Sequence, residues 1–138
     1  MANGFYQQGM KHFALGDIVW KASAGSAIRT ALIDSADYTV DLVNHEFRTS
    51  VASIAQEETS ADMTLIDAAT DGVVDANDLT FTATSGDQCE GVLVYRNVGT
   101  QATDLLLFWW DTASGLPVTL GGDVTVTWDS GANKIAKI

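Results

Sequence analysis

The sequence contains a single cysteine and no long apolar run, and each scarcity excludes a class of protein. With Cys89 alone, no disulfide can form within the chain, and such sparing use of cysteine is typical of proteins made in a reducing cytoplasm. The most apolar stretch, Leu105 to Trp110, is far shorter than the ~20 residues that a membrane-spanning helix needs. The first residues, MANGFYQQGMKHFALGD, lack a basic region followed by an apolar run, so we expect no secretory signal.

Positive charge is also scarce. The chain has 7 Lys and Arg residues against 18 Asp and Glu residues, which gives a formal net charge of −11. Most of such a surface repels a polyanion, so we expect no nucleic-acid partner. The same repulsion disfavours an anionic membrane surface, and no membrane partner is expected.

The length and composition predict one globular domain. The chain has 138 residues, of which 46% are hydrophobic, so it can bury a core without disulfides or metals. We therefore expect a single domain over residues 1–138, with 1–16 as an N-terminal arm or short helix. Apolar spacing predicts one short helix over Gly4 to Leu15, ended by Gly16, and a second over Asp41 to Arg48.

The rest of the chain has the patterns of short β-strands. About ten runs of alternating or continuous apolar residues are separated by Gly, Asp, Asn and Ser clusters, and no strand–helix alternation is present. This predicts an all-β fold, an antiparallel two-sheet sandwich of which the jelly roll is one form. The two most apolar runs, Gly91 to Val98 and Thr103 to Asp111, are expected as central strands. The other expected strands are Ile18 to Trp20, Ala27 to Asp34, Arg48 to Ala55, Met63 to Asp67, Asp71 to Asp75, Asp78 to Thr84, Asp123 to Asp129 and Lys134 to Ile138.

Candidate catalytic and metal-binding residues are few. The carboxylates of Asp71 to Asp78 do not have the spacing of a calcium loop, and Asp and Asn are also common turn residues. His12 and His45 lack partners at metal-ligand or acid–base spacing. Cys89 has acidic neighbours, which disfavour a reactive thiolate. We therefore predict no catalytic residue, no metal and no cofactor, and a protein that is not an enzyme.

Three adjacent aromatic residues suggest a strand that is covered on both faces. In a strand, Trp109 points away from Phe108 and Trp110. One face is then the domain core, and the other is either a subunit contact or part of an ordinary central strand with an exposed Trp edge.

The chain ends carry an excess of basic residues beside apolar ones, which is an arrangement suited to binding an acidic protein surface. The alternative is a frayed N-terminus and an ordinary edge strand. The predicted partner-binding residues are Phe5, Tyr6, Lys11, Phe13, Trp109, Lys134, Ile135, Lys137 and Ile138.

Several segments, together spanning residues 28 to 138, carry a likeness to a known group of proteins. They are Ile28 to Asp34 with Ala36 to Tyr38, Asn44 to Phe47, Gly72 to Phe81, Thr112 to Thr119 and Trp128 to Ile135. In these segments the chain resembles a family of small virion proteins of tailed bacteriophages. The shared motifs are patterns of strands and turns rather than catalytic signatures.

The resemblance implies a component of a phage particle that is made in the host cytoplasm. A capsid decoration or cement protein on the outside of the shell is the first expectation, with the major capsid protein or copies of the chain itself as partners, and a homo-oligomer such as a trimer. A tail or head–tail connector subunit is the second. A carbohydrate-binding module is an alternative of another class, in which Trp20, Trp109 or Trp110 stacks on sugar rings.

Overall fold

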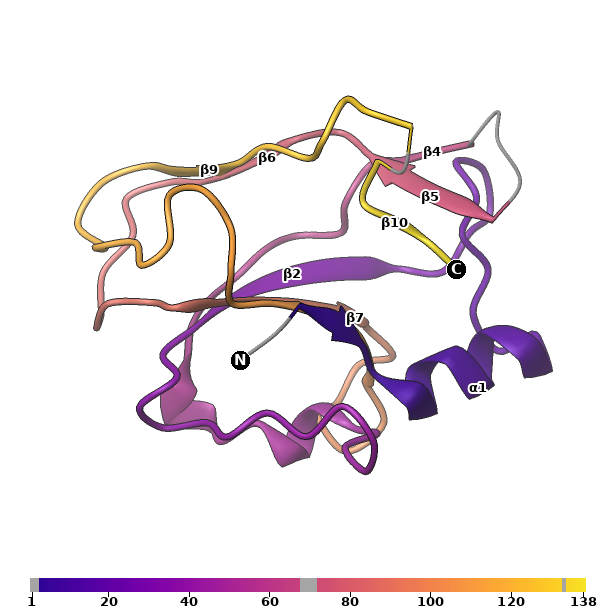
Figure 1. The fold of residues 1–138 in the computed structure, drawn as a ribbon, viewed down its shortest axis with the longest axis horizontal. Coiled ribbons are helices and arrows are strands. Elements are labelled where there is room, and N and C mark those ends of the chain that lie inside the picture. Colours follow the sequence, from indigo (N-terminus) through magenta and orange to yellow (C-terminus); the bar gives the residue numbers. More distant parts are fainter. Residues whose placement is uncertain (1–2, 68–71, 133) are drawn as a thin grey trace.

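A five-stranded antiparallel sheet forms the centre of the molecule (Figure 1). The computed structural model describes residues 3–67, 72–132 and 134–138. In spatial order the strands of this central sheet are β1 (Gly4–Phe5), β8 (Leu105–Trp110), β7 (Gly91–Arg96), β2 (Ile28–Ile33) and β3 (Gln56–Thr59).

A second layer covers one face of the central sheet (Figure 1). It consists of a three-stranded sheet, in the order β10 (Ala136–Lys137), β5 (Val73–Ala76) and β4 (Leu65–Ile66), and a two-stranded sheet of β6 (Leu79–Phe81) and β9 (Val124–Val126). The opposite face is covered by residues 34–55, which include the 3-10 helices η1 (Arg48–Ser50) and η2 (Ser53–Ala55). The predicted all-β, antiparallel, sandwich-like fold is confirmed, whereas the jelly-roll strand order stays a prediction.

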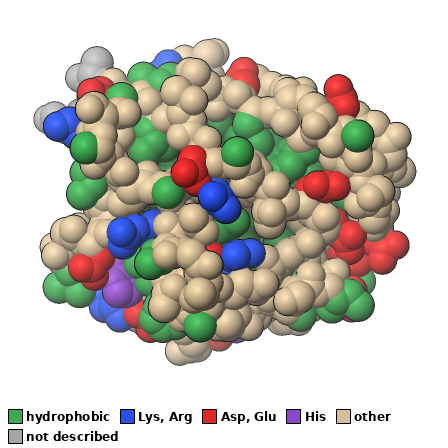
Figure 2. Space-filling view, turned by 180° about the vertical axis from the view of Figure 1, so that it is seen from behind, with side chains coloured by type: hydrophobic (Ala, Val, Ile, Leu, Met, Phe, Trp, Pro, Cys, Tyr) green, Lys and Arg blue, Asp and Glu red, His purple; other side chains and the backbone are tan. Residues whose placement is uncertain are grey.

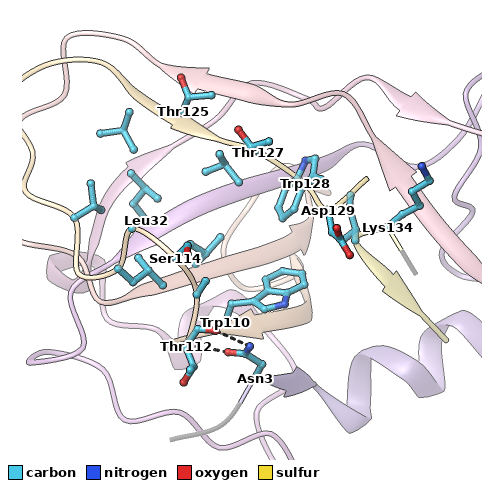
Figure 3. Close-up of a pocket in the computed structure, with 18 residues that line it drawn as sticks. Asn3, Leu32, Trp110, Thr112, Ser114, Thr125, Thr127, Trp128, Asp129 and Lys134 are labelled. Atoms are coloured by element: carbon cyan, nitrogen blue, oxygen red, sulfur yellow. Dashed lines mark hydrogen bonds between the residues drawn. The ribbon is translucent and has the colours of Figure 1, made fainter. Parts of the chain in front are cut away.

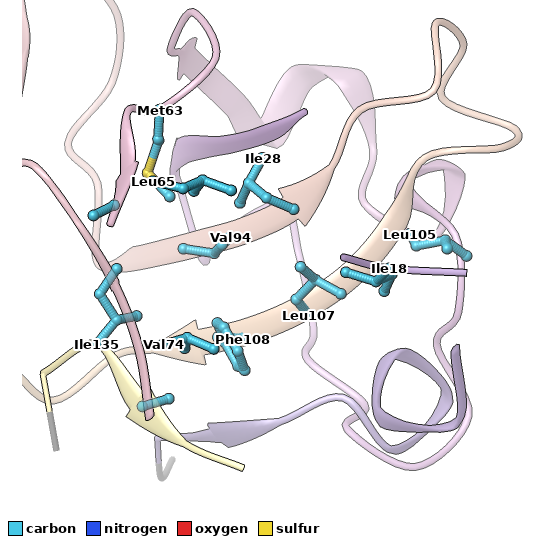
Figure 4. Close-up of a cluster of buried hydrophobic side chains, with 12 residues drawn as sticks. Ile18, Ile28, Met63, Leu65, Val74, Val94, Leu105, Leu107, Phe108 and Ile135 are labelled. Atoms are coloured by element: carbon cyan, nitrogen blue, oxygen red, sulfur yellow. The ribbon is translucent and has the colours of Figure 1, made fainter. Parts of the chain in front are cut away.

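Both faces of the central sheet are buried because β7 and β8 are almost wholly apolar. Val94, Leu107 and Phe108 join Leu65, Val74 and Ile135 of the second layer in one cluster (Figure 4). On the opposite face, Leu93, Tyr95, Leu106 and Trp109 pack with Tyr38 and Val51. The expected alternation is therefore confirmed, since Trp109 points away from Phe108 and Trp110. The face that holds Trp109 is covered by the chain itself.

One helix, α1 (Gln7–Leu15), packs against β8 at the edge of the central sheet. The helix ends because Gly16 adopts a left-handed conformation (φ 83°), from which its N–H reaches the carbonyl oxygens of His12 and Phe13. Gly9 is the buried residue of the helix, and it lies directly against the carbonyl oxygen of Leu106. The predicted N-terminal helix is confirmed from Gln7 to Leu15, whereas Gly4–Phe5, at the start of the predicted range, is strand β1.

The second predicted helix, over Asp41 to Arg48, is wrong. The Asp41 carboxylate accepts hydrogen bonds from the backbone N–H groups of Val43 and Asn44 (3.0 and 2.9 Å), which closes a turn in place of a helix. Phe47 then forms an isolated bridge to Leu105.

Two predicted strands are also wrong. Residues 48–55 form η1 and η2, and the strand begins only at β3, whose sequence Gln-Glu-Glu-Thr has no apolar signal. Ile18 to Trp20 forms no strand; Ile18 and Trp20 instead insert into the core as irregular chain. The predicted strand over Asp71 to Asp75 is confirmed from Val73 onward, and Asp71 lies outside the described residues.

Candidate functional site

The register of the central sheet divides the charged side chains between two ends of the molecule. At one end, Ile33 of β2 lies opposite Gly91 of β7, so the neighbouring Asp34 and Glu90 are close together. At the other end, Ile28 lies opposite Arg96, beside Arg29. In Figure 2, Lys and Arg lie on the left-hand and middle parts of the visible face, mixed with some Asp and Glu, whereas the right-hand end displays Asp and Glu without Lys or Arg.

The acidic end is centred on carboxylates from three segments. One carboxylate oxygen each of Asp34, Glu57 and Asp87 lies within 4.8 Å of the others. Three carboxylates at such separations suit a hard cation. However, Asp34 already accepts a hydrogen bond from the backbone N–H of Ala36 (2.8 Å), and acidic groups of this kind are common without an ion. We assign no metal to this group. The predicted turn over Asp71 to Asp78 is separate from it, and its first residue lies outside the described chain.

Cys89 is fully buried beside this acidic end. Burial raises the pKa of its thiol to about 12, with the negative charges of Glu57, Glu90, Asp34 and Glu58 adding to the effect. A thiol with such a pKa holds very little thiolate at neutral pH and is a poor nucleophile.

The opposite, basic end brings both terminal regions of the chain together (Figure 1). The Trp20 indole donates a hydrogen bond to the Asp75 carbonyl oxygen (2.7 Å), and the backbone N–H of Ala22 donates to the Asp67 carboxylate (2.8 Å). Lys137 pairs with Val73 in the sheet of β10 and β5. The segment that carries Lys21 therefore lies beside the strands that end the chain.

This end presents apolar side chains to solvent. Leu15 is 67% exposed, Val19 45% and Ile138 44%. Within the described residues, neither Lys21 nor Lys137 takes part in an ion pair. We call these five residues the terminal surface. Lysines that are held in no ion pair, next to exposed aliphatic groups, are suited to an acidic protein partner.

The two histidines hold structural contacts. His12 lies between two carboxylates, with Nδ1 2.6 Å from Asp17 and Nε2 2.7 Å from Glu46. The hydrogen bonds from His12 and then Lys11 hold the pKa of Glu46 below its ordinary value. With both ring nitrogens occupied, His12 has none available for a metal or a substrate, and its role is to join α1 to the segment around Glu46.

His45 ends a partly buried chain of hydrogen bonds. Its Nδ1 lies 2.9 Å from the Tyr38 hydroxyl, which in turn lies 2.9 Å from the Tyr6 hydroxyl. Burial raises the pKa values of both tyrosines, so they remain neutral. The chain of contacts fixes the start of α1 to residues 38–45.

The predicted partner-binding residues separate into buried and exposed groups. Tyr6, Trp109 and Ile135 lie in the chain's own core, and Phe13 is half-buried against it. The face of β8 that carries Trp109 is therefore buried within the domain and is not a subunit contact. Those that reach the surface are Phe5, Lys11, Lys134, Lys137 and Ile138, with Lys134 half-buried. The predicted set lacks Leu15, Val19 and Lys21, because only the folded chain brings them beside β10.

No protein-family model and no curated protein matches this chain. Among the described residues, no helix is long and apolar enough to cross a membrane.

Proposed function

We propose that this chain is a structural protein of a tailed-phage particle, and specifically a decoration or cement protein that binds the outside of the capsid. The observation that carries the proposal is the division of charge along the molecule. A basic, partly apolar end docks on an acidic shell surface, and the acidic end faces solvent.

The charge also suits the stages before and after assembly. A net charge of −11 keeps free copies apart in the host cytoplasm. On the shell, one orientation attracts and the reverse one repels, which gives each copy a defined direction. The partner is the major capsid protein, with neighbouring copies of the chain in contact as a homo-oligomer. The likeness of residues 28 to 138 to small phage virion proteins supports the same assignment.

A tail or head–tail connector subunit is the second candidate, since the resemblance covers virion proteins in general. Such subunits close rings through long arms. In the described residues the longest connection between named elements is 34–47, and it packs on the central sheet instead of extending from it. This packing favours the decoration role.

The experiment measures binding to shells assembled without this protein. Deletion of residues 1–15 is unsuitable because it removes Tyr6 from the core, so surface substitutions are used. Lys21→Gln/Lys137→Gln removes two positive charges from the terminal surface. Thr82→Glu/Thr119→Glu, at exposed positions outside it, changes the net charge by the same amount and is the control.

We expect the lysine variant to bind about tenfold more weakly, and the control to bind nearly as the wild type does, at the same ionic strength. Equal binding by all three proteins would show that the terminal surface does not bind the shell. If the wild-type protein does not bind shells at all, the decoration role is wrong and a tail or connector role replaces it.

A further inference from the structure

A groove with a volume of about 380 Å³ opens between the central sheet, β9 and residues 112–118 (Figure 3). Its floor is apolar and comes from both layers of the sandwich: Leu32 and Val92 from the central sheet, Val124 and Val126 from β9. These β9 side chains are only half-buried, because the two layers do not close over them. A volume at the lower end of the roughly 300–1,000 Å³ range of ligand sites fits one or two small rings.

Two tryptophans stand at one end of the groove. Trp110 ends β8 and Trp128 follows β9, with ring centroids 5.6 Å apart and planes tilted by 51°. Figure 3 shows the two indoles one above the other beside Asp129. Flat aromatic surfaces of this kind pack well against the C–H faces of a ring-shaped ligand.

The indole N–H groups distinguish these tryptophans from the other two. Trp20 donates to the Asp75 carbonyl oxygen and Trp109 to the Asp111 carboxylate. The Trp128 Nε1 atom is buried without a hydrogen-bond partner. Over the described chain, Trp110 Nε1 also has no acceptor. The Trp128 N–H is sealed from solvent whereas the Trp110 N–H is not, so the Trp110 N–H is the unpaired indole donor that a ligand in the groove can reach.

The rim of the groove offers further polar groups. The hydroxyl of Ser114 lines it, is exposed, and makes no hydrogen bond within the residues that the structure describes. One side chain of each charge, Asp129 and Lys134, lies at the same end as the indoles. With opposite charges at the rim and a net charge of −11 on the chain, an anionic ligand is disfavoured.

We propose that this groove binds a neutral sugar, as a monosaccharide or a disaccharide unit of a longer glycan. The ring packs against the Trp110 and Trp128 indoles, and its hydroxyls pair with the Ser114 hydroxyl, the charged groups of Asp129 and Lys134, and the Trp110 N–H group. A purely aliphatic ligand makes no hydrogen bonds, so it would leave these polar groups unpaired. It should therefore bind more weakly than a sugar. The proposal is independent of the capsid role, since the groove and the terminal surface share no residue.

The test is a titration of protein labelled with ¹⁵N, followed through its four indole N–H signals. The probes are glucose, galactose, mannose, N-acetylglucosamine, maltose, cellobiose and lactose, with hexanol as an apolar comparison. We expect at least one sugar to shift the Trp110 and Trp128 signals, with a dissociation constant of about a millimolar. The Trp20 and Trp109 signals, whose donors are already paired, stay in place and serve as internal controls.

Variants then test the rim. Ser114→Ala removes the exposed hydroxyl at the rim, so we expect sugar binding to weaken about tenfold. Thr82→Val, at an exposed position that does not line the groove, leaves binding unchanged. The proposal is overturned if no sugar moves the two signals at concentrations of roughly 50 mM. It is equally overturned if hexanol moves them and the sugars do not.

Discussion

The Arg48 guanidinium and the Asp104 carboxylate form an ion pair of 2.8 Å in which the Asp104 side chain has no exposed surface. Arg48 also lies over the Tyr95 ring, 4.6 Å from its centroid, and Asp104 accepts a hydrogen bond from the backbone N–H of Val98 (2.6 Å). The pair thus joins η1 to the loop between β7 and β8. A buried pair of this kind is costly to break, because removal of one charge leaves the other without a partner.

We expect Asp104→Asn to lower the free energy of unfolding by about 3 kcal/mol, because it leaves the Arg48 charge unpaired. Asp62→Asn is the matched control, since the Arg29–Asp62 pair has the same chemistry but is 34% and 53% exposed. That variant should lose less than about 1 kcal/mol. Urea unfolding measures both, and equal losses would contradict a special role for the buried pair.

Gly9 tests the contact between α1 and β8. An alanine Cβ at this position overlaps the Leu106 carbonyl oxygen, which is main chain and cannot move aside easily. Gly9→Ala should therefore destabilise the protein by about 2 kcal/mol, although alanine normally favours a helix by up to about 1 kcal/mol. Gly122→Ala, where nothing lies within 4 Å, is the control and should change stability little. A stabilised Gly9→Ala variant would show that α1 sits farther from β8.

Cys89 provides a test of burial. With a thiol pKa of about 12 and no exposed surface, it should resist iodoacetamide in the native protein at pH 8 and react once the chain is unfolded in urea. Mass spectrometry of the alkylated protein measures the difference. Labelling at the same rate in both states would mean that the acidic end opens readily.

Because the pKa of Glu46 is lowered in the folded protein, we expect this residue to contribute to a loss of stability in acid. Its folded pKa lies below the ordinary 4.5, so its stabilising contribution is complete above that value and is lost as the pH falls through the folded pKa. Glu46→Gln should reduce the fall in unfolding free energy between pH 5 and lower values. Denaturant unfolding at a series of pH values tests this, and a variant curve parallel to that of the wild type would contradict the assignment.

The fold class and the central strands are predictable from the sequence because continuous apolar runs leave few alternatives. β7 and β8 lie within the two most apolar runs, and α1 ends at the expected Gly16. β3 is missed because its side chains are polar and its place depends on pairing with β2. Residues 48–55 alternate in hydrophobicity, yet η1 and η2 replace the strand there.

The candidate surfaces are harder to predict, because they depend on register and on long-range contacts. No local sequence pattern indicates that Lys21 lies beside β10. Likewise, no local pattern indicates that residues 34–55 bury Trp109. The groove does have a signal in the sequence. Val124, Val126 and Trp128 alternate on one face, and an alternating strand that ends in an aromatic residue marks a half-buried layer. Its second tryptophan, Trp110, comes from a strand distant in sequence.

The most direct test of the proposed function is to locate this protein in purified particles by cryo-electron microscopy, comparing particles made with and without it. We expect density for the chain on the outer surface of the capsid. The terminal surface of Leu15, Val19, Lys21, Lys137 and Ile138 should lie against the shell, and the acidic end that contains Asp34 and Glu57 should face solvent. Density confined to the tail or the connector, or an orientation with the acidic end against the shell, would contradict it.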